Sequence, residues 1–371
     1  IFKDADAITL PELLGRLHEA VAAHTNGSSF RAKDLRSFLR LLVILSQDYD
    51  VALMNPPYGS QRRMPEAVRM YVRSKYTYTA DYYINFIEVC SNVVCQNGRF
   101  AALVPRSFMF NQSLIQFRED YIGVKGEFDF LAEFGIGVLD NATVRTAGVI
   151  IRNRKHVADK SLFIRLNDVD SKDKEGEYAK VVSDSESERR YKRQTSSFGL
   201  IPGSNMSYWA SKKIRSIYQS DSVLDAKNAN VDKNSVAKVK HGITTGNNSR
   251  FVKYFWEIDS SEWVPFAKGG EDAWMLPKVD RIIYWKDGSE IRRLTNSVIR
   301  NEQDLFNRAL TYTVAKETGR RFGLLQEGSV FDAKGSVVIP QKVDEYTLLA
   351  YLNSRLTDYL MLCQTPDRMW Q

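Results

Sequence analysis

The stretch Asp50–Gly59, which reads DVALMNPPYG, decides the fold prediction. Four apolar residues, Val51 to Met54, run directly into an Asn-Pro-Pro-Tyr string. A short apolar run bounded by turn residues is typical of a buried strand. Two successive prolines stiffen the exit from such a strand, because each ring fixes φ at about −65°. The sequence therefore predicts a strand that ends in a rigid loop at Asn55.

Helical and strand-like patterns alternate on both sides of this stretch. Helices are expected over residues 9–24, after Asp34, from Pro65, from Thr79 to Asn97-Gly98, and ending at Tyr121; strands are expected over 51–54, 100–104, 128–134 and 147–151. This alternation predicts a mostly parallel α/β sheet over residues 40–155. Ligands of such sheets bind beyond the carboxyl ends of the strands, which is where Asn55 is placed.

Length and composition set broad limits. The chain has 371 residues, 43% of them hydrophobic and 26% charged, which is ordinary for a globular protein of about two domains. Its 52 basic and 45 acidic residues leave a net charge of +7, which permits a polyanionic partner without requiring one. With three cysteines and four histidines we expect no disulfide framework, no metal site and a cytoplasmic location. No apolar run approaches the ~20 residues of a membrane span.

Changes in composition along the sequence predict three segments. Residues 1–160 form a first domain. Residues 161–197 are polar and charge-dense, and are interpreted as a linker or surface excursion. Residues 198–371 carry many turn signals and short β-like runs such as Ser336–Ile339, and are expected to form a second, mixed α/β domain. The tryptophans of this second domain are expected in its core: they are Trp256, Trp263, Trp274 and Trp285.

The Asn-Pro-Pro-Tyr string is suited to a particular chemistry. A rigid turn can hold the Asn55 side-chain oxygen and the Pro56 carbonyl as a fixed pair of acceptors, which matches the two donors of an exocyclic amine. Pro57 completes the brace, and Tyr58 offers a flat face for a base, worth ~1–3 kcal/mol. The acceptors would draw charge onto the amine nitrogen and aim its lone pair at an electrophile. The alternative is a proline-braced turn whose tyrosine only packs.

The string DVALMNPPYG resembles the catalytic motif of N6-adenine DNA methyltransferases in which target recognition follows the catalytic half. More narrowly, the chain resembles the BREX-type (phage-growth-limitation) methyltransferases and their fused, type IIL-like restriction–methylation relatives. The resemblance runs through most of the chain. It is carried by ADYYINFIEVC, GRFAALVPRSFMF, TAGVIIRN, KHGITTGNNSRFVKYFWEI, WVPFAKGG, and VFDAKGS followed by LLAYLNSRLTDYL.

The resemblance implies a fold and a set of roles. Residues 1–160 would be the C-terminal part of a Rossmann-like methyltransferase sheet, and 198–371 an incomplete target-recognition domain. Asn55 and the Pro56 carbonyl would accept from the adenine N6 amine while Tyr58 stacks on the flipped base. Phe86 would pack against the adenine ring of S-adenosylmethionine. Leu139, within the loop Gly135–Val144, would cover the other face of the base, where the family usually has phenylalanine.

The resemblance also implies a departure at the cofactor site. The family's glycine-rich motif for S-adenosylmethionine lies upstream of the catalytic motif, and no such motif is found before Asp50. The chain is therefore expected to be a fragment without that motif. Gly135 and Gly137 form a G-x-G after a predicted strand, which a permuted enzyme could use for the cofactor, but a single G-x-G is a weak signal.

A loop in the second domain is the candidate DNA contact. It is rich in glycine, threonine and asparagine and is flanked by cations, and arginine and asparagine commonly read base edges. Its candidate DNA-binding residues are Lys240, His241, Thr244, Thr245, Asn247, Asn248 and Arg250. The alternative for each is a solvated turn between strands.

The leading functional hypothesis is a site-specific DNA methyltransferase. It would transfer a methyl group from S-adenosylmethionine to N6 of a flipped adenine, in protection of host DNA and phage defence. Its partners would be double-stranded DNA and other proteins of the defence system. Two alternatives stay open: an amino-methyltransferase acting on RNA or protein glutamine, and a DNA-binding or partner-binding module that is inactive by itself.

Overall fold

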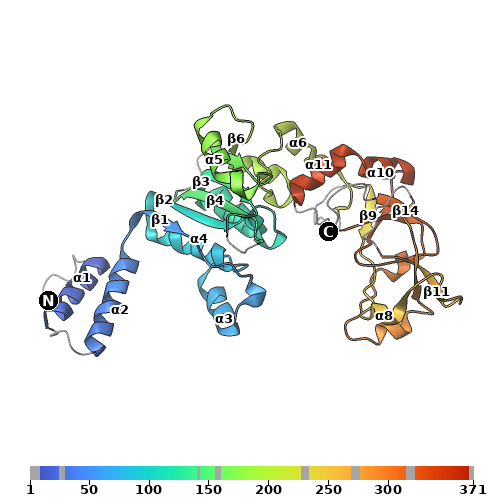
Figure 1. Ribbon diagram of the computed structural model, residues 1–371, viewed down its shortest axis with the longest axis horizontal. Helices are drawn as coiled ribbons and strands as arrows, with labels where there is room; N and C mark the ends of the chain where they lie inside the picture. Colours follow the sequence, from blue (N-terminus) through green and yellow to red (C-terminus); the bar gives the residue numbers. More distant parts are fainter. Residues whose placement is uncertain are drawn as a thin grey trace. The chain divides into compact units, whose positions relative to one another are not determined.

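A computed structural model describes residues 9–24, 30–139, 143–154, 160–226, 234–268, 276–314 and 322–366 (Figure 1). The chain divides into two compact units. The first comprises Ile1–Gly199 and Gly203–Trp209, and the second comprises Leu200–Pro202 and Ala210–Gln371. The α/β class predicted from the sequence is confirmed, with helices and a mixed sheet in the first unit and a second mixed α/β unit after it.

The first unit is built on a six-stranded sheet in the order β1-β2-β4-β3-β5-β6. Its strands are β1 (Tyr49–Met54), β2 (Val94–Pro105), β3 (Glu127–Gly135), β4 (Thr146–Arg152), β5 (Lys160–Arg165) and β6 (Arg190–Gln194). The β1–β2 and β3–β5 pairs are parallel, and the other three pairs are antiparallel. The expectation of a mostly parallel sheet is therefore wrong.

The connection between β3 and β4 explains this difference. Parallel neighbours need a crossover of about a dozen residues or more, usually through a helix. The segment between Gly135 and Thr146 is shorter than that, so β4 turns back beside β3 and pairs with it antiparallel. The other edge of β4 pairs with β2, also antiparallel. A hydrophobic strand pattern does not contain this information, because both directions bury the same residues.

Helices of the first unit are α1 (Leu10–His24), α2 (Phe30–Ser46), α3 (Glu66–Lys75), α4 (Tyr82–Val93), the π-helical η5 (Phe117–Lys125) and α5 (Lys174–Ser183). Short 3-10 turns occur at η2 (Gln61–Arg63), η3 (Arg106–Met109), η4 (Gln112–Leu114), η6 (Ser171–Asp173), η7 (Thr195–Leu200) and η8 (Pro202–Ser204). The helix expected from Thr79 to Gly98 ends earlier, at Val93. Residues from Val94 onward pair with β1 instead, and a Cβ on Gly98 would lie 2.8 Å from the Asp50 carbonyl oxygen.

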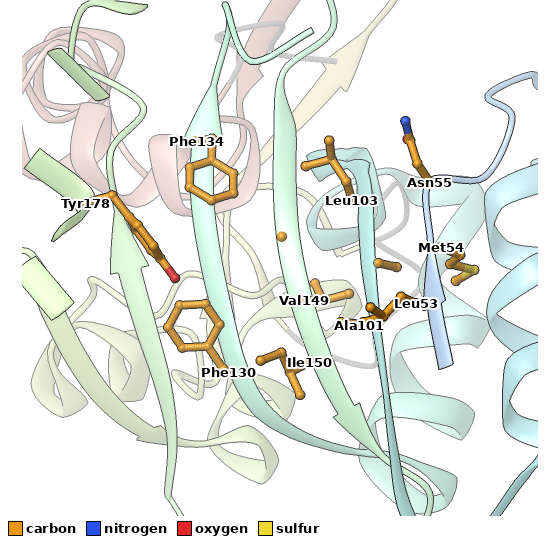
Figure 2. Close-up of a pocket in the computed structure, with 12 residues that line it drawn as sticks. Leu53, Met54, Asn55, Ala101, Leu103, Phe130, Phe134, Val149, Ile150 and Tyr178 are labelled. Carbon is orange, nitrogen blue, oxygen red and sulfur yellow. The ribbon is translucent and has the colours of Figure 1, made fainter. Parts of the chain in front are cut away.

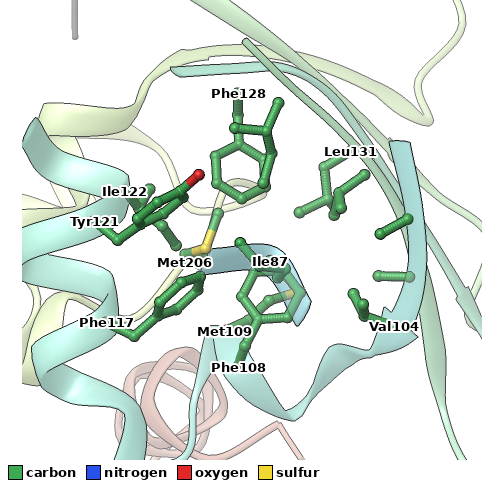
Figure 3. Close-up of a cluster of buried hydrophobic side chains, with 14 of the residues drawn as sticks. Ile87, Val104, Phe108, Met109, Phe117, Tyr121, Ile122, Phe128, Leu131 and Met206 are labelled. Carbon is green, nitrogen blue, oxygen red and sulfur yellow. The ribbon is translucent and has the colours of Figure 1, made fainter. Parts of the chain in front are cut away.

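One face of the sheet carries the main hydrophobic core, which Figure 3 shows. Tyr83 and Ile87 of α4 and Phe117 of η5 lie on this face, each no more than 1% exposed. Phe108 and Phe128 stack there with ring centroids 6.2 Å apart. Aromatic side chains bury large apolar areas, so this cluster fixes α4 against the strands.

The opposite face is covered only in part. Helix α5 packs over β3 and β5, where Ala132, Ile164, Leu166 and Val181 are buried together. Strand β5, helix α5 and strand β6 all lie within residues 160–194. The segment 161–197, expected as a linker or surface excursion, thus contains elements that complete the first sheet, and most of its charged residues lie on their solvent side.

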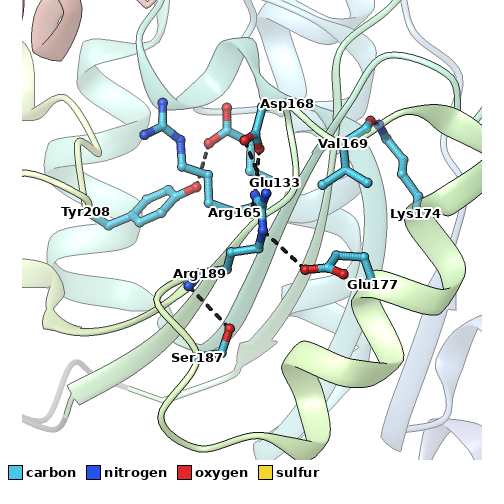
Figure 4. Close-up of polar contacts among 9 residues, drawn as sticks. All are labelled: Glu133, Arg165, Asp168, Val169, Lys174, Glu177, Ser187, Arg189 and Tyr208. Atoms are coloured by element: carbon cyan, nitrogen blue, oxygen red, sulfur yellow. Dashed lines mark hydrogen bonds and ion pairs between the residues drawn. The ribbon is translucent and has the colours of Figure 1, made fainter.

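A buried ion pair joins three segments of the first unit. Arg106, 3% exposed, pairs with the fully buried Glu133 of β3. The Tyr208 hydroxyl donates to the second Glu133 oxygen at 2.5 Å (Figure 4). Nearby, Arg189 binds Asp168 at 2.6 Å and Glu177 at 3.3 Å, which ties α5 to the end of the sheet. The buried carboxylate therefore holds the ends of β2 and β3 and the Gly203–Trp209 segment together.

The second unit contains two four-stranded sheets, in the orders β10-β12-β11-β15 and β14-β13-β16-β9, and a two-stranded pair β7-β8. The strands are β7 (Ser222–Val223), β8 (Asn234–Ser235), β9 (Ala237–Lys240), β10 (Val252–Tyr254), β11 (Trp263–Ala267), β12 (Arg281–Tyr284), β13 (Ala309–Tyr312), β14 (Phe322–Leu325), β15 (Val330–Phe331) and β16 (Val337–Pro340). The helices are α6 (Lys212–Ile217), α8 (Asn248–Phe251), α9 (Ser289–Arg292), η9 (Glu302–Asp304), α10 (Glu345–Leu352) and α11 (Arg355–Gln364).

The tryptophans of the second unit differ in burial. Trp285 is buried, as expected, whereas Trp263 is half-buried and Trp256 is 61% exposed, so the core assignment is wrong for Trp256. Trp274 lies outside the described residues. Within the described ranges, every helix falls short of the length and apolarity that crossing a membrane requires.

We expect the Arg106–Glu133 pair to be important for stability. Replacing Arg106 by Met should lower the free energy of unfolding by about 3–5 kcal/mol, because Glu133 is left buried without its partner. Urea denaturation measures this. The matched control is Arg99→Met, since Arg99 is half-exposed beside Asp129 and should cost only about 0–1 kcal/mol. Equal losses of stability in the two variants would contradict the buried-pair argument.

Candidate functional site

The Asn-Pro-Pro-Tyr string leaves the carboxyl end of β1, as predicted. Asn55 is exposed, Pro56 is buried and Pro57 is exposed. The Tyr58 hydroxyl donates to the Leu103 carbonyl of β2 at 3.0 Å and lies 3.4 Å from Asn55 Oδ1. Burial raises the pKa of the Tyr58 phenol above its ordinary value. The tyrosine is thus fixed in place while the asparagine amide faces solvent.

A second contact fixes the Tyr58 ring. It meets Tyr83 of α4 edge to face, with ring centroids 6.3 Å apart. The Tyr83 hydroxyl in turn lies 3.2 Å from Ser107 Oγ, just beyond β2. The ring of Tyr58 is therefore held between the end of one strand and a buried helix residue, so its orientation is set before any ligand arrives.

The loop is also tied down where it leaves the string. Gly59 donates its backbone N–H to Asp81 Oδ1 at 3.0 Å, and Tyr82 donates its own N–H to the Gly59 carbonyl at 3.1 Å. Burial raises the pKa of the Asp81 carboxyl above its usual range, although the Gly59 N–H opposes that effect. Sequence reasoning missed Asp81. Its signal is the position directly before α4, where aspartate is a favoured helix cap.

Asn55 lies at the rim of an apolar groove on the sheet face opposite the main core (Figure 2). The groove has a volume of about 420 Å³ and crosses β1, β2, β4 and β3. Its walls include Leu53, which is 79% exposed, and the aromatic rings of Phe134 and Tyr178. Asn55 therefore borders accessible, largely apolar space, which suits an aromatic ligand.

Phe86 belongs to α4, the helix whose Tyr83 contacts Tyr58 of the Asn-Pro-Pro-Tyr string. Its ring is 41% exposed on α4, one helical turn before Cys90. The Cys90 sulfur lies 3.5 Å from the Met54 sulfur, directly before Asn55. Since residues four apart share a helix face, Phe86 lies on the side of α4 that faces the end of β1. An exposed ring there fits a flat ligand such as an adenine ring of a cofactor.

The loop after β3 is tightly packed at its start. Gly135 and Gly137 have φ of 74° and 89°, and a Cβ on Gly137 would lie 1.8 Å from Ser171 Oγ. The G-x-G thus has a packing reason within the first unit. Leu139 is half-buried, and residues 140–142 lie outside the described chain. Sequence reasoning missed Ile136 and Val138, which are 46% and 39% exposed on the same loop.

The cations of the candidate DNA loop have acidic neighbours. Lys240 lies 3.9 Å from Asp304, and Arg250 binds Glu290 at 2.6 Å. The Arg250 guanidinium also lies over the Phe251 ring, 4.8 Å from its centroid. Each of these two cations therefore has an acidic neighbour in this structure.

The polar residues of the loop also have internal partners. Thr245 is buried and its hydroxyl donates to Asn248 Oδ1 at 2.7 Å. The Asn247 side chain caps α8 by accepting the Arg250 N–H at 3.1 Å. His241 Nδ1 lies 3.0 Å from Ser336 Oγ. Thr244 is exposed. The structure brings the seven predicted residues together in one loop, in which most side chains have a structural contact.

Comparison with known proteins places the chain among methyltransferase-like sequences. Residues 16–129 match the Eco57I restriction-modification methylase family. The adenine-specific methyltransferase BrxX of Escherichia coli O9:H4 (strain HS) is 25% identical over 380 residues, covering 97% of this chain and 30% of the relative. The adenine-specific methyltransferase PglX of Lacticaseibacillus casei (strain Zhang) is 25% identical over 364 residues, covering 90% and 29%. The chain spans about 30% of the length of these curated relatives.

Two solved structures share the fold across most of the chain. The type IIL restriction-modification enzyme MmeI in complex with DNA has a TM-score of 0.50 at 13% identity, over 82% of this chain and 42% of that one. The DrdV–DNA complex has a TM-score of 0.51 at 12% identity, over 93% and 44%. The resemblance to BREX-type and type IIL-like methyltransferases that the motifs indicate is confirmed.

We expect Asp81 to hold the motif loop. Asp81→Ala removes the acceptor of the Gly59 N–H and should lower the free energy of unfolding by about 1–3 kcal/mol, as for an unsatisfied part-buried donor. Asp81→Asn keeps that oxygen and should cost less. Urea denaturation of both variants, with the exposed Asp48→Ala as control, measures the difference. An Asp81→Ala chain as stable as Asp81→Asn would show that this bond does not matter.

Proposed function

We propose that this chain supplies the catalytic and target-recognition part of a DNA adenine-N6 methyltransferase. The single observation that carries the proposal is the exposed Asn55 amide at the end of β1, beside a Tyr58 ring fixed by Leu103 and Tyr83. Support comes from the relatives BrxX and PglX, which are adenine-specific methyltransferases, and from fold neighbours solved with DNA.

In the proposed reaction Asn55 Oδ1 and the Pro56 carbonyl oxygen accept the two N6 hydrogens of adenine. This holds the amine in place and orients its lone pair away from the acceptors, so that electron density gathers on nitrogen. When bound, S-adenosylmethionine would supply an electrophilic methyl group and leave as the thioether. Asn55 Oδ1 and the Pro56 carbonyl would hold N6 toward that methyl group, and the proton that N6 gives up would pass to solvent water. Catalysis by this chain is therefore positioning and electrostatics.

A paired adenine is out of reach of this pair of acceptors, so the base must leave the duplex. Tyr58 would stack on one face of the flipped base. The loop after β3 would cover the other face with Leu139 and with the exposed apolar residues Ile136 and Val138. Aliphatic side chains supply contact area there without the π-stacking of an aromatic ring.

The proposed share of this chain in the cofactor site is the exposed ring of Phe86. A glycine-rich motif upstream of Asp50 is not found in the sequence, and the curated relatives are longer than this chain. We propose that the main contacts to S-adenosylmethionine come from a part of the protein outside these residues. The setting we propose is cytoplasmic protection of host DNA against phage, with duplex DNA and other defence proteins as partners.

Asn55→Ala should abolish most methyl transfer by the complete enzyme. Loss of one preorganised acceptor is expected to lower kcat by about 10²–10³-fold, by analogy with the removal of an oxyanion-hole donor. Affinity for duplex DNA should stay within about twofold. Methylation of an adenine-containing duplex and its binding are measured in parallel, with the exposed Asn307→Ala of the second unit as control. Normal methylation by Asn55→Ala would overturn the role of Asn55.

Calorimetric titration tests the cofactor assignment. If the main contacts lie outside this chain, it should bind S-adenosylmethionine with a Kd weaker than about 1 mM, because one aromatic ring supplies little of the binding free energy. Phe86→Ala serves as the matched variant and should abolish any residual heat. Micromolar binding by this chain would show instead that the chain holds a complete cofactor site.

A further inference from the structure

Residues 296–301, here called the companion segment, lie beside the candidate DNA loop. The sequence motifs do not reveal this arrangement. The backbone N–H and carbonyl of Thr244 exchange two hydrogen bonds with Val298, each 2.8 Å long. Asn301 donates its side-chain amide to the His241 carbonyl at 2.9 Å, and Asn296 donates to the Gly246 carbonyl at 3.3 Å. Residues 296–301 therefore run antiparallel beside residues 241–246.

The other side of the loop is also occupied by backbone. Ile243 donates to the Phe331 carbonyl at 2.9 Å, and Ala333 donates to the Ile243 carbonyl at 3.0 Å. A Cβ on Gly242 would lie 2.0 Å from the Phe331 carbonyl oxygen. The loop thus lies between two backbone segments, to which isolated bridges at Ile243 and Thr244 join it. Its glycines are needed for this packing, so they are not by themselves a sign of ligand contact.

Burial alternates along the companion segment. Asn296, Val298 and Arg300 are exposed, whereas Ile299 packs against the core of the second unit. The Thr244–Val298 register sets Gly242 opposite Arg300. Directly opposed side chains of a strand pair point to the same side. The solvent-facing side of these two paired segments therefore presents exposed side chains mainly from the companion segment.

The cations of this region differ in whether they have an acidic partner. Lys240 and Arg250 lie beside Asp304 and Glu290, and Arg292 binds Glu302. Arg293 and Arg300 are also exposed, and for these two no ion pair is found in the part of the second unit that the structure describes. A guanidinium group without an acidic partner has its planar fork of donors available, and that fork matches a phosphate.

We propose that residues 293–300 form a contact site for the phosphate backbone of duplex DNA, with Arg293 and Arg300 as the phosphate-binding groups. The backbone pairing of Thr244 with Val298 would place the Arg300 side chain on the solvent-facing side of the two segments. Lys240 and Arg250 would then act mainly within the protein, by holding the loop. The inference rests on the proposed function and gives its DNA contact a specific location.

The salt dependence of DNA binding tests this site. Removing one phosphate-binding cation should reduce the slope of log K against log salt by about 0.9. We expect Arg293→Ala and Arg300→Ala of the full chain to reduce it by about that amount each, and the double variant by about twice as much. Binding to a defined duplex is measured by fluorescence anisotropy across a salt series, and thermal unfolding confirms that each variant is folded.

Arg292→Ala and Arg308→Ala are the matched controls, since these two exposed arginines bind Glu302 and Glu345. Each removes the same formal charge from an ion-paired arginine and should leave the slope nearly unchanged. An unchanged slope in the double variant, or an equal reduction of the slope in the controls, would overturn this site while leaving the proposed function intact. Absence of salt-dependent duplex binding by the unsubstituted chain would overturn both. Tighter binding to an RNA duplex, abolished in the same variants, would overturn the assignment to DNA.

Discussion

The structure of the candidate site depends on the Asn55–Gly59 loop, which is fixed at its middle and at its exit. Two prolines limit the backbone of the string itself. The Tyr58 hydroxyl attaches its middle to β2, and the Gly59 N–H attaches its exit to Asp81 before α4. Asn55 is exposed, and the residues that follow it in the loop are held by these contacts. An acceptor pair is useful in catalysis only if it needs no reorganisation when the substrate arrives.

This constraint explains why the local fold could be predicted well from the sequence and the sheet could not. Strand β1 and the start of α3 after Pro65 follow from apolar runs and turn residues in their immediate neighbourhood. The direction of β4 depends instead on the length of the connection from Gly135 to Thr146 and on a pairing with β2. Residues far apart in sequence determine that pairing, so local patterns miss it.

The segment 161–197 shows a related limit. Its charge density favoured a linker, because charged runs are usually solvated. In the structure Arg189 uses its charge to bind Asp168 and Glu177, and thereby secures α5 against the sheet. The same residue types that mark a surface excursion can thus hold an element in place. The sequence shows which residues are charged but not which residues they bind. Those partners determine whether a charged residue is solvated or holds an element in place.

The two glycine-rich loops lead to the same conclusion about candidate sites. In Gly135-x-Gly137 the lack of a side chain permits positive φ and contact with Ser171. At Gly242 it permits approach to the Phe331 carbonyl. Both strings look like ligand loops in the sequence, and in both the glycines are required by the protein's own packing. A glycine marks a close approach of backbone to something, and only the structure tells whether that neighbour is protein or ligand. For the second unit this moves attention from the loop to the side chains that remain exposed beside it, Arg293 and Arg300, whose charges the described part of the chain leaves unpaired.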